Sequence, residues 1–364
     1  MSKLPHLEML RGVAASLVVA DHGLTSLVAA GSLPAEITPY AYLLGMMGVV
    51  VFFVISGFLM VRTTASVPGG PATAVDFGAR RLLRIVPLYY IATLAQVLTD
   101  SLKGAPPTMG EIVKSLLFIP YGPSFDQPMH PIVGQGWTLN YEMFFYALFA
   151  VMLLAPRAWS AKILLALLML LVGVGALMRP LAPYTPPTTA LQFWADPVLL
   201  YFAFGMMLGM AERRFGPWTG MRWSIPASLA LVALAAAIFH FGGVTFPVSL
   251  EWQVVFGVLA AIIVVVCIAD HTPADGWVAR LLVACGSASF STYLFHTRIL
   301  NLGLRAWSKL PAVLDHPLLL IIALVVSANA VGYAIYRLVE RPVDRLLRRI
   351  FWAKLPKRPQ PQAA

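Results

Sequence analysis

Long apolar stretches dominate this chain and predict membrane-spanning helices. A helix needs about 20 mainly apolar residues to cross the hydrocarbon core of a bilayer. Ten stretches meet this requirement: 8–30, 41–61, 82–100, 137–155, 161–178, 195–211, 223–241, 251–269, 281–300 and 317–338. The shorter run 111–121 carries Glu111 and Lys114, so we expect an interfacial or re-entrant helix there. The pattern predicts an all-α polytopic membrane protein with about ten transmembrane helices and both termini on one side.

The composition supports a membrane location and the charge orients the chain. Of the 364 residues, 59% are hydrophobic and only 12% are charged, whereas soluble domains carry about 25% charged residues. This excludes a soluble two-domain enzyme, which the length would allow. In the ten-span arrangement, all but six of the 26 Lys and Arg lie on the side of the termini; the six are Lys103, Lys114, Arg179, Arg298, Arg305 and Lys309. The positive-inside rule therefore makes both termini cytoplasmic, and the net charge of +10 requires no nucleic-acid partner.

We expect two regions along the chain. Residues 1–344 form one transmembrane domain, and the basic, Pro-rich residues 345–364 form a cytoplasmic tail that meets anionic membrane lipids. Charged residues interrupt the first apolar run, so we interpret it as an uncleaved span and not as a signal peptide. Cys267 and Cys285 both lie in apolar runs, which indicates buried packing and neither a disulfide framework nor a metal site.

Arg11, Asp21 and His22 lie within the first span, and an ionisable group inside a membrane indicates a functional site. Arg11 and His22 are eleven residues apart, which places them on the same helix face, roughly 16 Å from each other. This spacing suits one elongated ligand, with an anionic group at Arg11 and a reactive end at His22. His22 could instead form only an interhelical hydrogen bond. Asp21 could pair with a neighbouring span or support catalysis.

Further candidates lie in the second and third spans. Arg81 and Arg84 are three residues apart and share a helix face, as a fork that can bind phosphates or carboxylates. They could also anchor the helix at the membrane surface, the interpretation that we prefer for Arg80. Ser56 and Gly57 allow either close helix approach or room for the arm of a cofactor.

The fourth and ninth spans carry polar groups near the outer surface. Trp137 suits an interfacial anchor, and Glu142 lies about one and a half turns below it. Glu142 could bind a sugar hydroxyl, transfer a proton, or form a structural ion pair with Arg298. His296 could line a pocket or have a structural role. We expect the remaining histidines to be solvated in loops or at span ends: His6, His130, His240, His271 and His316.

Six short segments follow one another along the chain in an order that is typical of one family. They are Leu10-Arg11-Gly12-Val13-Ala14-Ala15 with His22, Phe52-Phe53-Val54-Ile55-Ser56-Gly57-Phe58-Leu59, Arg81-x-x-Arg84-Ile85-x-Pro87-x-Tyr89, Trp137-Thr138-Leu139-x-x-Glu142-x-x-Phe145-Tyr146, Ser289-Phe290-x-x-Tyr293-Leu294-x-His296 and Glu340-Arg341-Pro342. Together they resemble the acyltransferase 3 family of bacterial inner-membrane O-acyltransferases. The segment from Gly136 to Glu142 is most similar to the exopolysaccharide O-acetyltransferase branch.

The resemblance implies transfer of an acetyl or longer acyl group from acyl-CoA to a hydroxyl of a surface polysaccharide, an exopolysaccharide or a lipid-linked precursor, without a metal. It implies that His22 is the essential histidine, as a general base or as an acyl carrier, and that Arg11, Arg81 and Arg84 bind the donor. We add Ser56 to the donor site and Asp21 and Glu142 to the catalytic group. Trp137, Tyr293 and His296 are candidates for acceptor binding.

Two other classes of protein remain open from the residues alone. A transporter or flippase for a lipid-linked sugar could use His22 and Glu142 to relay protons. A scaffold subunit of a polysaccharide-export complex would need neither residue in the membrane.

Overall fold

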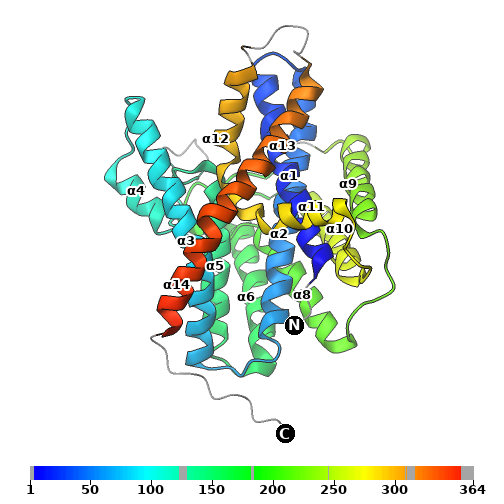
Figure 1. The fold of residues 1–364 in the computed structure, drawn as a ribbon. Coiled ribbons are helices and arrows are strands. Elements are labelled where there is room, and N and C mark those ends of the chain that lie inside the picture. The colour runs from blue at the N-terminus through cyan, green and yellow to red at the C-terminus, as the bar shows by residue number, and fades with distance from the viewer. Residues whose placement is uncertain are drawn as a thin grey trace.

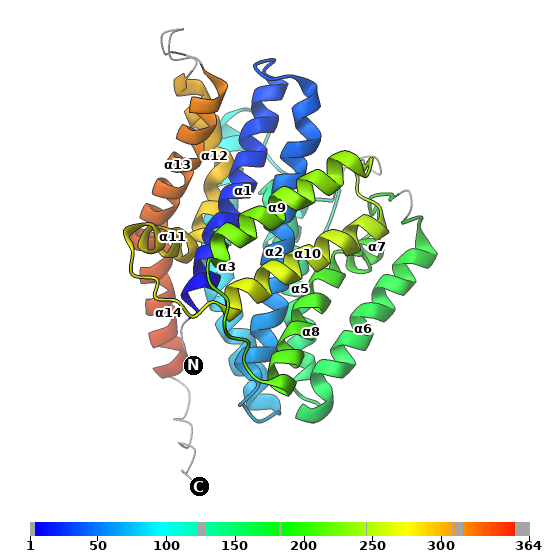
Figure 2. The same ribbon diagram turned by 90° about the vertical axis from the view of Figure 1, so that its right-hand side faces the viewer.

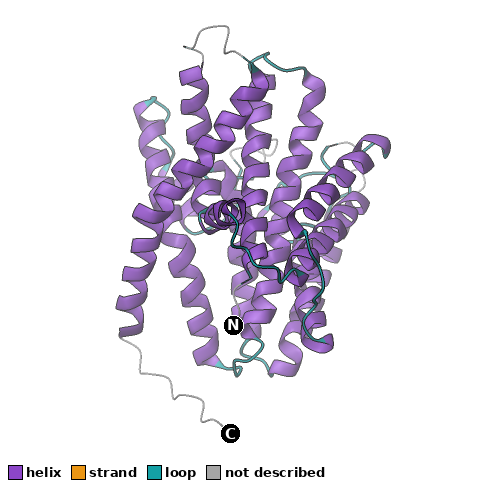
Figure 3. Cartoon of the chain, turned by 45° about the vertical axis from the view of Figure 1, so that its right-hand side comes forward, coloured by secondary structure: helices purple, strands orange, loops and turns teal. Residues whose placement is uncertain are grey.

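The computed structural model describes residues 4–122, 129–181, 184–244, 246–307, 309 and 316–353. Figure 3 shows helices joined by loops, and the described ranges contain no β-strand. The α-helices are α1 (Pro5–Ala29), α2 (Thr38–Thr64), α3 (Pro71–Leu102), α4 (Met109–Leu116), α5 (Trp137–Met152), α6 (Arg157–Met178), α7 (Ala190–Trp194), α8 (Leu199–Phe215), α9 (Ser224–Phe241), α10 (Leu250–Ala269), α11 (Trp277–Ser287), α12 (Ser289–Trp307), α13 (Pro317–Ile335) and α14 (Arg341–Ala353). The all-α polytopic fold is confirmed.

The number of spans differs from the predicted ten. Within the described residues, eight helices are long and apolar enough to cross a membrane, and α11 with α12 makes a ninth if this bent pair is one span. The remaining predicted span, 137–155, corresponds to α5, which has 16 residues. Such a helix is about 24 Å long and falls short of the hydrocarbon thickness. The run 111–121 overlaps the eight-residue helix α4, which is too short to span, as expected.

Helix α2 lies at the centre of the bundle, where it packs against α1, α5, α8, α9 and α10 (Figures 1 and 2). In the span that contains α2, 67% of the most apolar window is buried inside the protein, against 22% for the spans that contain α6 and α13. Leu170 and Leu177 of α6 are 63% and 90% exposed. In a membrane, such apolar faces contact lipid, so α6 and α13 form the periphery and α2 the interior.

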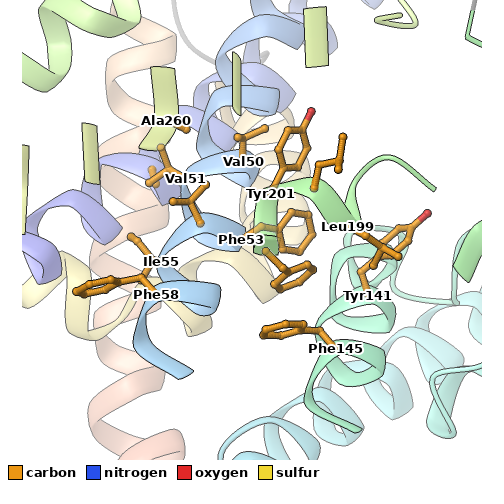
Figure 4. Packing of buried hydrophobic residues seen from close by; sticks show 14 of the residues in the cluster. Val50, Val51, Phe53, Ile55, Phe58, Tyr141, Phe145, Leu199, Tyr201 and Ala260 are labelled. Atoms are coloured by element: carbon orange, nitrogen blue, oxygen red, sulfur yellow. The ribbon is translucent and has the colours of Figure 1, made fainter. Parts of the chain in front are cut away.

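Close packing between α2 and α8 depends on glycine. A Cβ atom at Gly57 would overlap the carbonyl oxygen of Phe202, and one at Gly205 would overlap the backbone of Val54 and Phe58. Small residues let helix backbones approach closely in membranes, where packing drives association. Gly57 therefore has the packing role that the sequence allowed. Figure 4 shows the adjoining core, in which Phe53 of α2 lies beside residues of α5 and α8.

The predicted span 281–300 is broken at Ala288, where the axes of α11 and α12 meet at 78°. Helix α11 runs across the molecule in Figure 1, whereas α12 rises alongside α1 and α13. Gly286 at the end of α11 packs against the carbonyl of Glu8, which allows close approach to α1. The break therefore brings the first turn of α12 against the first turns of α1.

The structure corrects the expectations for His6 and Cys285. His6 is buried and not solvated, because its Nδ1 contacts the Ser224 hydroxyl at 2.9 Å and its Nε2 contacts the Thr272 carbonyl at 2.9 Å. Cys267 is buried as expected, whereas Cys285 is half-buried. The expected domain boundary at residue 344 falls inside α14, and residues 354–364 of the predicted tail lie outside the described residues. The start of α1 and the end of α14 lie at the same end of the molecule (Figures 1 and 2).

Candidate active site

Two cavities contain nearly all the predicted site residues. One has a volume of about 100 Å³ and is lined by Arg11, Arg81 and Arg84; we call it the arginine cavity. The other has a volume of about 840 Å³ and is lined by Asp21 and His22; we call it the histidine cavity. Arg11 and His22 share one helix, as predicted, but they line different cavities.

The arginine cavity brings together cations from α1 and α3. Arg11 donates to both carboxylate oxygens of Glu8 at 3.1 Å and to the Ser289 hydroxyl at 3.0 Å. The Arg81 guanidinium lies over the rings of Tyr146 and Phe77, at 5.2 and 5.6 Å from their centroids. Arginine is the side chain best suited to bidentate binding of phosphate, so this cavity can hold a polyanion.

Glu142 lies in the arginine cavity and not on the outer side of His22. Its carboxylate accepts hydrogen bonds from the Ser56 hydroxyl at 2.9 Å and from the Tyr146 hydroxyl. The structural pair with Arg298 is wrong, because Arg298 instead donates to Gln96 and to the Ala92 carbonyl. Ser56 therefore lines the cavity beside Glu142, whereas its neighbour Gly57 packs against α8.

Carboxylates surround the arginines in this cavity. Arg84 lies in the electrostatic field of Glu142, Glu340 and Glu8. Glu340 also accepts a hydrogen bond of 2.5 Å from the Ser291 hydroxyl, which connects the π-helical turn Tyr336–Glu340 to α12. These acidic groups offset the positive charge of the three partly buried arginines. Without such partners, the arginines would carry a large desolvation cost inside a membrane.

Sequence reasoning missed three members of the arginine cavity environment: Tyr146, Ser289 and Glu340. The helical spacing of four residues from Glu142 to Tyr146 could have identified Tyr146. Ser289 and Glu340 each belong to a noted motif, but no spacing rule joins them to Arg11 or Arg84. Arg80, which we expected to be an anchor, forms an exposed ion pair with Asp76 at 3.1 Å.

His22 lines the histidine cavity with a side chain that is 42% exposed. Its Nδ1 lies 3.0 Å from the carbonyl oxygen of Val18, one helical turn earlier. A carbonyl only accepts hydrogen bonds, so Nδ1 carries the proton in the neutral ring. The lone pair then resides on Nε2, the state required of a general base or a nucleophile.

Asp21 lies beside His22, and within the described ranges no ion pair joins it to a cation on a neighbouring span. One carboxylate oxygen lies 3.5 Å from His22 Nδ1, and the residue is 8% exposed. A Cβ atom at Gly45 of α2 would overlap this carboxylate, so glycine provides the space for it. A carboxylate at this point would stabilise a positive charge on the His22 ring.

His296 lies beside His22 and is fully buried, outside the lining of either cavity. The two rings meet edge to face with centroids 4.8 Å apart. His296 Nδ1 contacts the carbonyl oxygen of Tyr293 at 2.6 Å. His296 thus packs against the candidate base and is not placed to touch a ligand in the histidine cavity.

The rest of the histidine cavity presents aromatic rings and amides. Trp137 and Tyr293, both predicted to bind the acceptor, line it, and so do the amide side chains of Gln96, Gln135 and Gln253. Aromatic faces and a few placed polar groups are typical of small-molecule binding pockets. Among the described residues, no three His, Cys, Asp or Glu side chains gather where they could hold a metal ion.

Comparison with known proteins decides the family. The acyltransferase domain family, acyltransferase 3, matches residues 4–337. The chain belongs to this family. It is therefore an O-acyltransferase, which favours the enzyme over the transporter and the scaffold, and the resemblance drawn from the six motifs is confirmed.

Curated relatives cover most of the chain. The exopolysaccharide production protein ExoZ of Rhizobium meliloti (strain 1021) is 33% identical over 326 residues, which span 85% of this chain and 93% of the relative. The acyltransferase MdmB of Streptomyces mycarofaciens is 25% identical over 95% of this chain and 93% of its own. The putative membrane-bound transacylase BcsY of Komagataeibacter xylinus is 28% identical over 79% of this chain and 70% of its own. No solved structure matches.

Proposed function

We propose that this acyltransferase transfers an acetyl group from acetyl-CoA to a hydroxyl of an exopolysaccharide, another surface polysaccharide or a lipid-linked precursor. The observation that carries the proposal is the pairing of the two cavities: three arginines line one and the candidate base His22 lines the other. The name of the relative ExoZ supports an exopolysaccharide acceptor.

Donor and acceptor enter from opposite sides of the bacterial inner membrane. Arg11 lies near the start of α1, and Arg81 and Arg84 lie in the first half of α3, on the side where Lys and Arg gather. By the positive-inside rule this side is cytoplasmic, where acetyl-CoA is available. The phosphates of the donor bind the arginines, and Ser56 lies beside the donor arm. Trp137 and Tyr293 contact the acceptor glycan.

The chemistry follows from the tautomer of His22. Nε2 takes the proton of the acceptor hydroxyl while its oxygen attacks the thioester carbonyl carbon. The new C–O bond forms, the C–S bond breaks, and His22 returns the proton to the thiolate of CoA. Asp21 stabilises the imidazolium between these steps. General base catalysis of this kind contributes about 10²–10⁴ in rate.

A covalent route uses the same atoms in a different order. His22 Nε2 attacks the thioester carbonyl carbon first, the C–S bond breaks, and CoA leaves as its thiolate. The acceptor oxygen then takes the acetyl group as the N–C bond to His22 breaks, and the hydroxyl proton passes to the CoA thiolate. Incubation of the purified protein with labelled acetyl-CoA alone separates the routes. Label on His22 in a single turnover supports the covalent route, and its absence supports direct transfer.

The proposed function is tested with purified protein, labelled acetyl-CoA and the host polysaccharide. We expect His22→Ala to lower glycan acetylation by about 10²-fold or more while the thermal unfolding temperature is retained. His240→Ala is the matched control, because His240 contacts Tyr40 outside both cavities. Full acetylation by the His22 variant would refute the proposed chemistry.

A further inference from the structure

A thin wall separates the two cavities. Of the residues that line each cavity, three line both: Val49 and Phe53 of α2 and Tyr293 of α12. His22 and Asp21 lie on one side of this wall, and Arg11, Arg81 and Arg84 lie on the other. A ligand held by the arginines must therefore pass Val49, Phe53 and Tyr293 to reach His22.

Two of the wall residues are fixed by their neighbours. Phe53 is 3% exposed and packs against Phe202, with ring centroids 4.6 Å apart; Figure 4 shows it in this core. The Tyr293 hydroxyl contacts the Thr138 hydroxyl at 2.8 Å and donates to the Gln135 carbonyl at 3.0 Å. These contacts tie Tyr293 of α12 to the start of α5.

A second hydrogen bond joins α12 to the segment that precedes α5. The Gln135 side chain donates to the Leu294 carbonyl at 2.6 Å, next to Tyr293 in the chain. Because packing and hydrogen bonds hold Phe53 and Tyr293, the wall cannot widen freely at these two positions. Val49, a small half-buried residue, is the side chain at which the opening is most easily changed.

We propose that Val49, Phe53 and Tyr293 determine the length of the acyl group that the enzyme transfers, with Val49 as the main specificity determinant. This inference rests on the proposed function, in which the thioester passes from the arginine cavity to His22. An apolar constriction admits a short acyl group, whereas each added methylene must fit between fixed rings. The donor class is therefore a short-chain acyl-CoA.

The test compares donors of increasing chain length in the full-length purified protein. Acetyl-CoA, butyryl-CoA and hexanoyl-CoA are supplied with one polysaccharide acceptor, and kcat/KM is measured for each. The wild type is expected to prefer acetyl-CoA. Val49→Ala is expected to raise the hexanoyl-to-acetyl ratio by about tenfold or more, because one or two methylenes in an apolar site discriminate by that much.

Val51→Ala is the matched control. Val51 lies on the same helix and is buried but lines neither cavity, so it reports the loss of packing alone. Its hexanoyl-to-acetyl ratio is expected to stay within about twofold of the wild type. Val49→Leu places a larger side chain in the wall and narrows the opening. This variant is expected to lower acetyl transfer with unchanged CoA affinity.

Each outcome separates this inference from the proposed function. If Val49→Ala and Val49→Leu both transfer acetyl groups with the wild-type chain-length ratio, the wall does not select the acyl group and the inference is wrong. A wild type that prefers hexanoyl-CoA also overturns it. If the wild type transfers no acyl group from any donor, the proposed function itself fails.

Discussion

At the scale of single residues, three neighbouring arginines differ in exposure and in the groups that surround them. Arg80, Arg81 and Arg84 lie within five consecutive residues of α3. Arg80 is exposed and pairs with Asp76, while Arg81 and Arg84 line the arginine cavity beside Glu142. An anchoring role alone would not separate the three residues in this way, so the proposed donor role is confined to Arg81 and Arg84.

The first prediction uses this contrast. The double variant Arg81→Ala with Arg84→Ala is expected to weaken CoA binding by at least about tenfold, since each hydrogen bond to a charged group contributes roughly 1.5–3 kcal/mol. Arg80→Ala is the control and should bind CoA as the wild type does. Isothermal titration with CoA measures both. Equal affinities in the two variants would return Arg81 and Arg84 to an anchoring role.

At the scale of helices, glycines set how closely α2 approaches α8. Gly205 faces the backbone of Val54 and Phe58, so an added methyl group has no space. Gly173 of α6 has nothing within 4 Å of an added Cβ atom. The two positions allow the same substitution to be compared in a packed and in an open environment.

The second prediction follows from this comparison. Gly205→Ala is expected to destabilise the protein by about 1–3 kcal/mol through overpacking. Gly173→Ala should have the stability of the wild type or exceed it slightly, because alanine favours helices over glycine. Thermal unfolding in detergent measures both variants. If both unfold at the same temperature, backbone contact between α2 and α8 is not limiting.

A polar cluster joins the start of α1 to the ends of two other helices. Asp270, directly after α10, accepts hydrogen bonds from the Ser224 backbone N–H and the Thr272 hydroxyl, and it lies 3.4 Å from His6. Burial opposes ionisation of this carboxyl group. The hydrogen bonds from Thr272 and Ser224 outweigh burial and lower the pKa of Asp270 to about 2.

The third prediction gives the pH dependence of this cluster. Because the folded state lowers the pKa below its ordinary value of 3.8, the ionised form stabilises the fold above about pH 4. This contribution is lost as the pH falls from about 4 toward 2. The difference in unfolding temperature between the wild type and Asp270→Asn should therefore shrink between pH 6 and pH 3. Asp275→Asn, at an exposed position, is the control. A difference that is constant with pH would contradict the prediction.

At the scale of the whole molecule, the site depends on how the chain lies in the membrane. The start of α1 and the end of α14 lie at one end of the bundle (Figures 1 and 2). In the proposed function, the arginine cavity faces the compartment that holds acyl-CoA and the histidine cavity is reached by the glycan. The orientation of the termini would then decide which substrate meets which cavity.

The fourth prediction tests this orientation in cells. A fluorescent protein that folds only in the cytoplasm should be bright when fused after Ala364. Alkaline phosphatase, which is active only in the periplasm, should be inactive at the same position. The positive-inside asymmetry of Lys and Arg is the physical reason. An active phosphatase fusion would reverse the assignment of the two cavities.

The sequence by itself determined the membrane class, the helix positions and the candidate chemistry. Apolar runs of about 20 residues are long enough to cross a bilayer and too apolar to face water. Helical spacing of three residues places Arg81 beside Arg84. These features are local, because they depend on residues within a few turns of each other. Each candidate residue could therefore be named before its neighbours were known.

The tertiary structure alone decided how those residues are grouped. It shows that Glu142 lines the arginine cavity and does not lie beside Arg298. It also shows that the predicted span 281–300 is broken at Ala288 and that a wall lies between Arg11 and His22. These features depend on contacts between helices distant in sequence, such as that of Ser56 of α2 with Glu142 of α5. Helical periodicity gives the face on which a residue lies, but only packing decides which other helix that face meets.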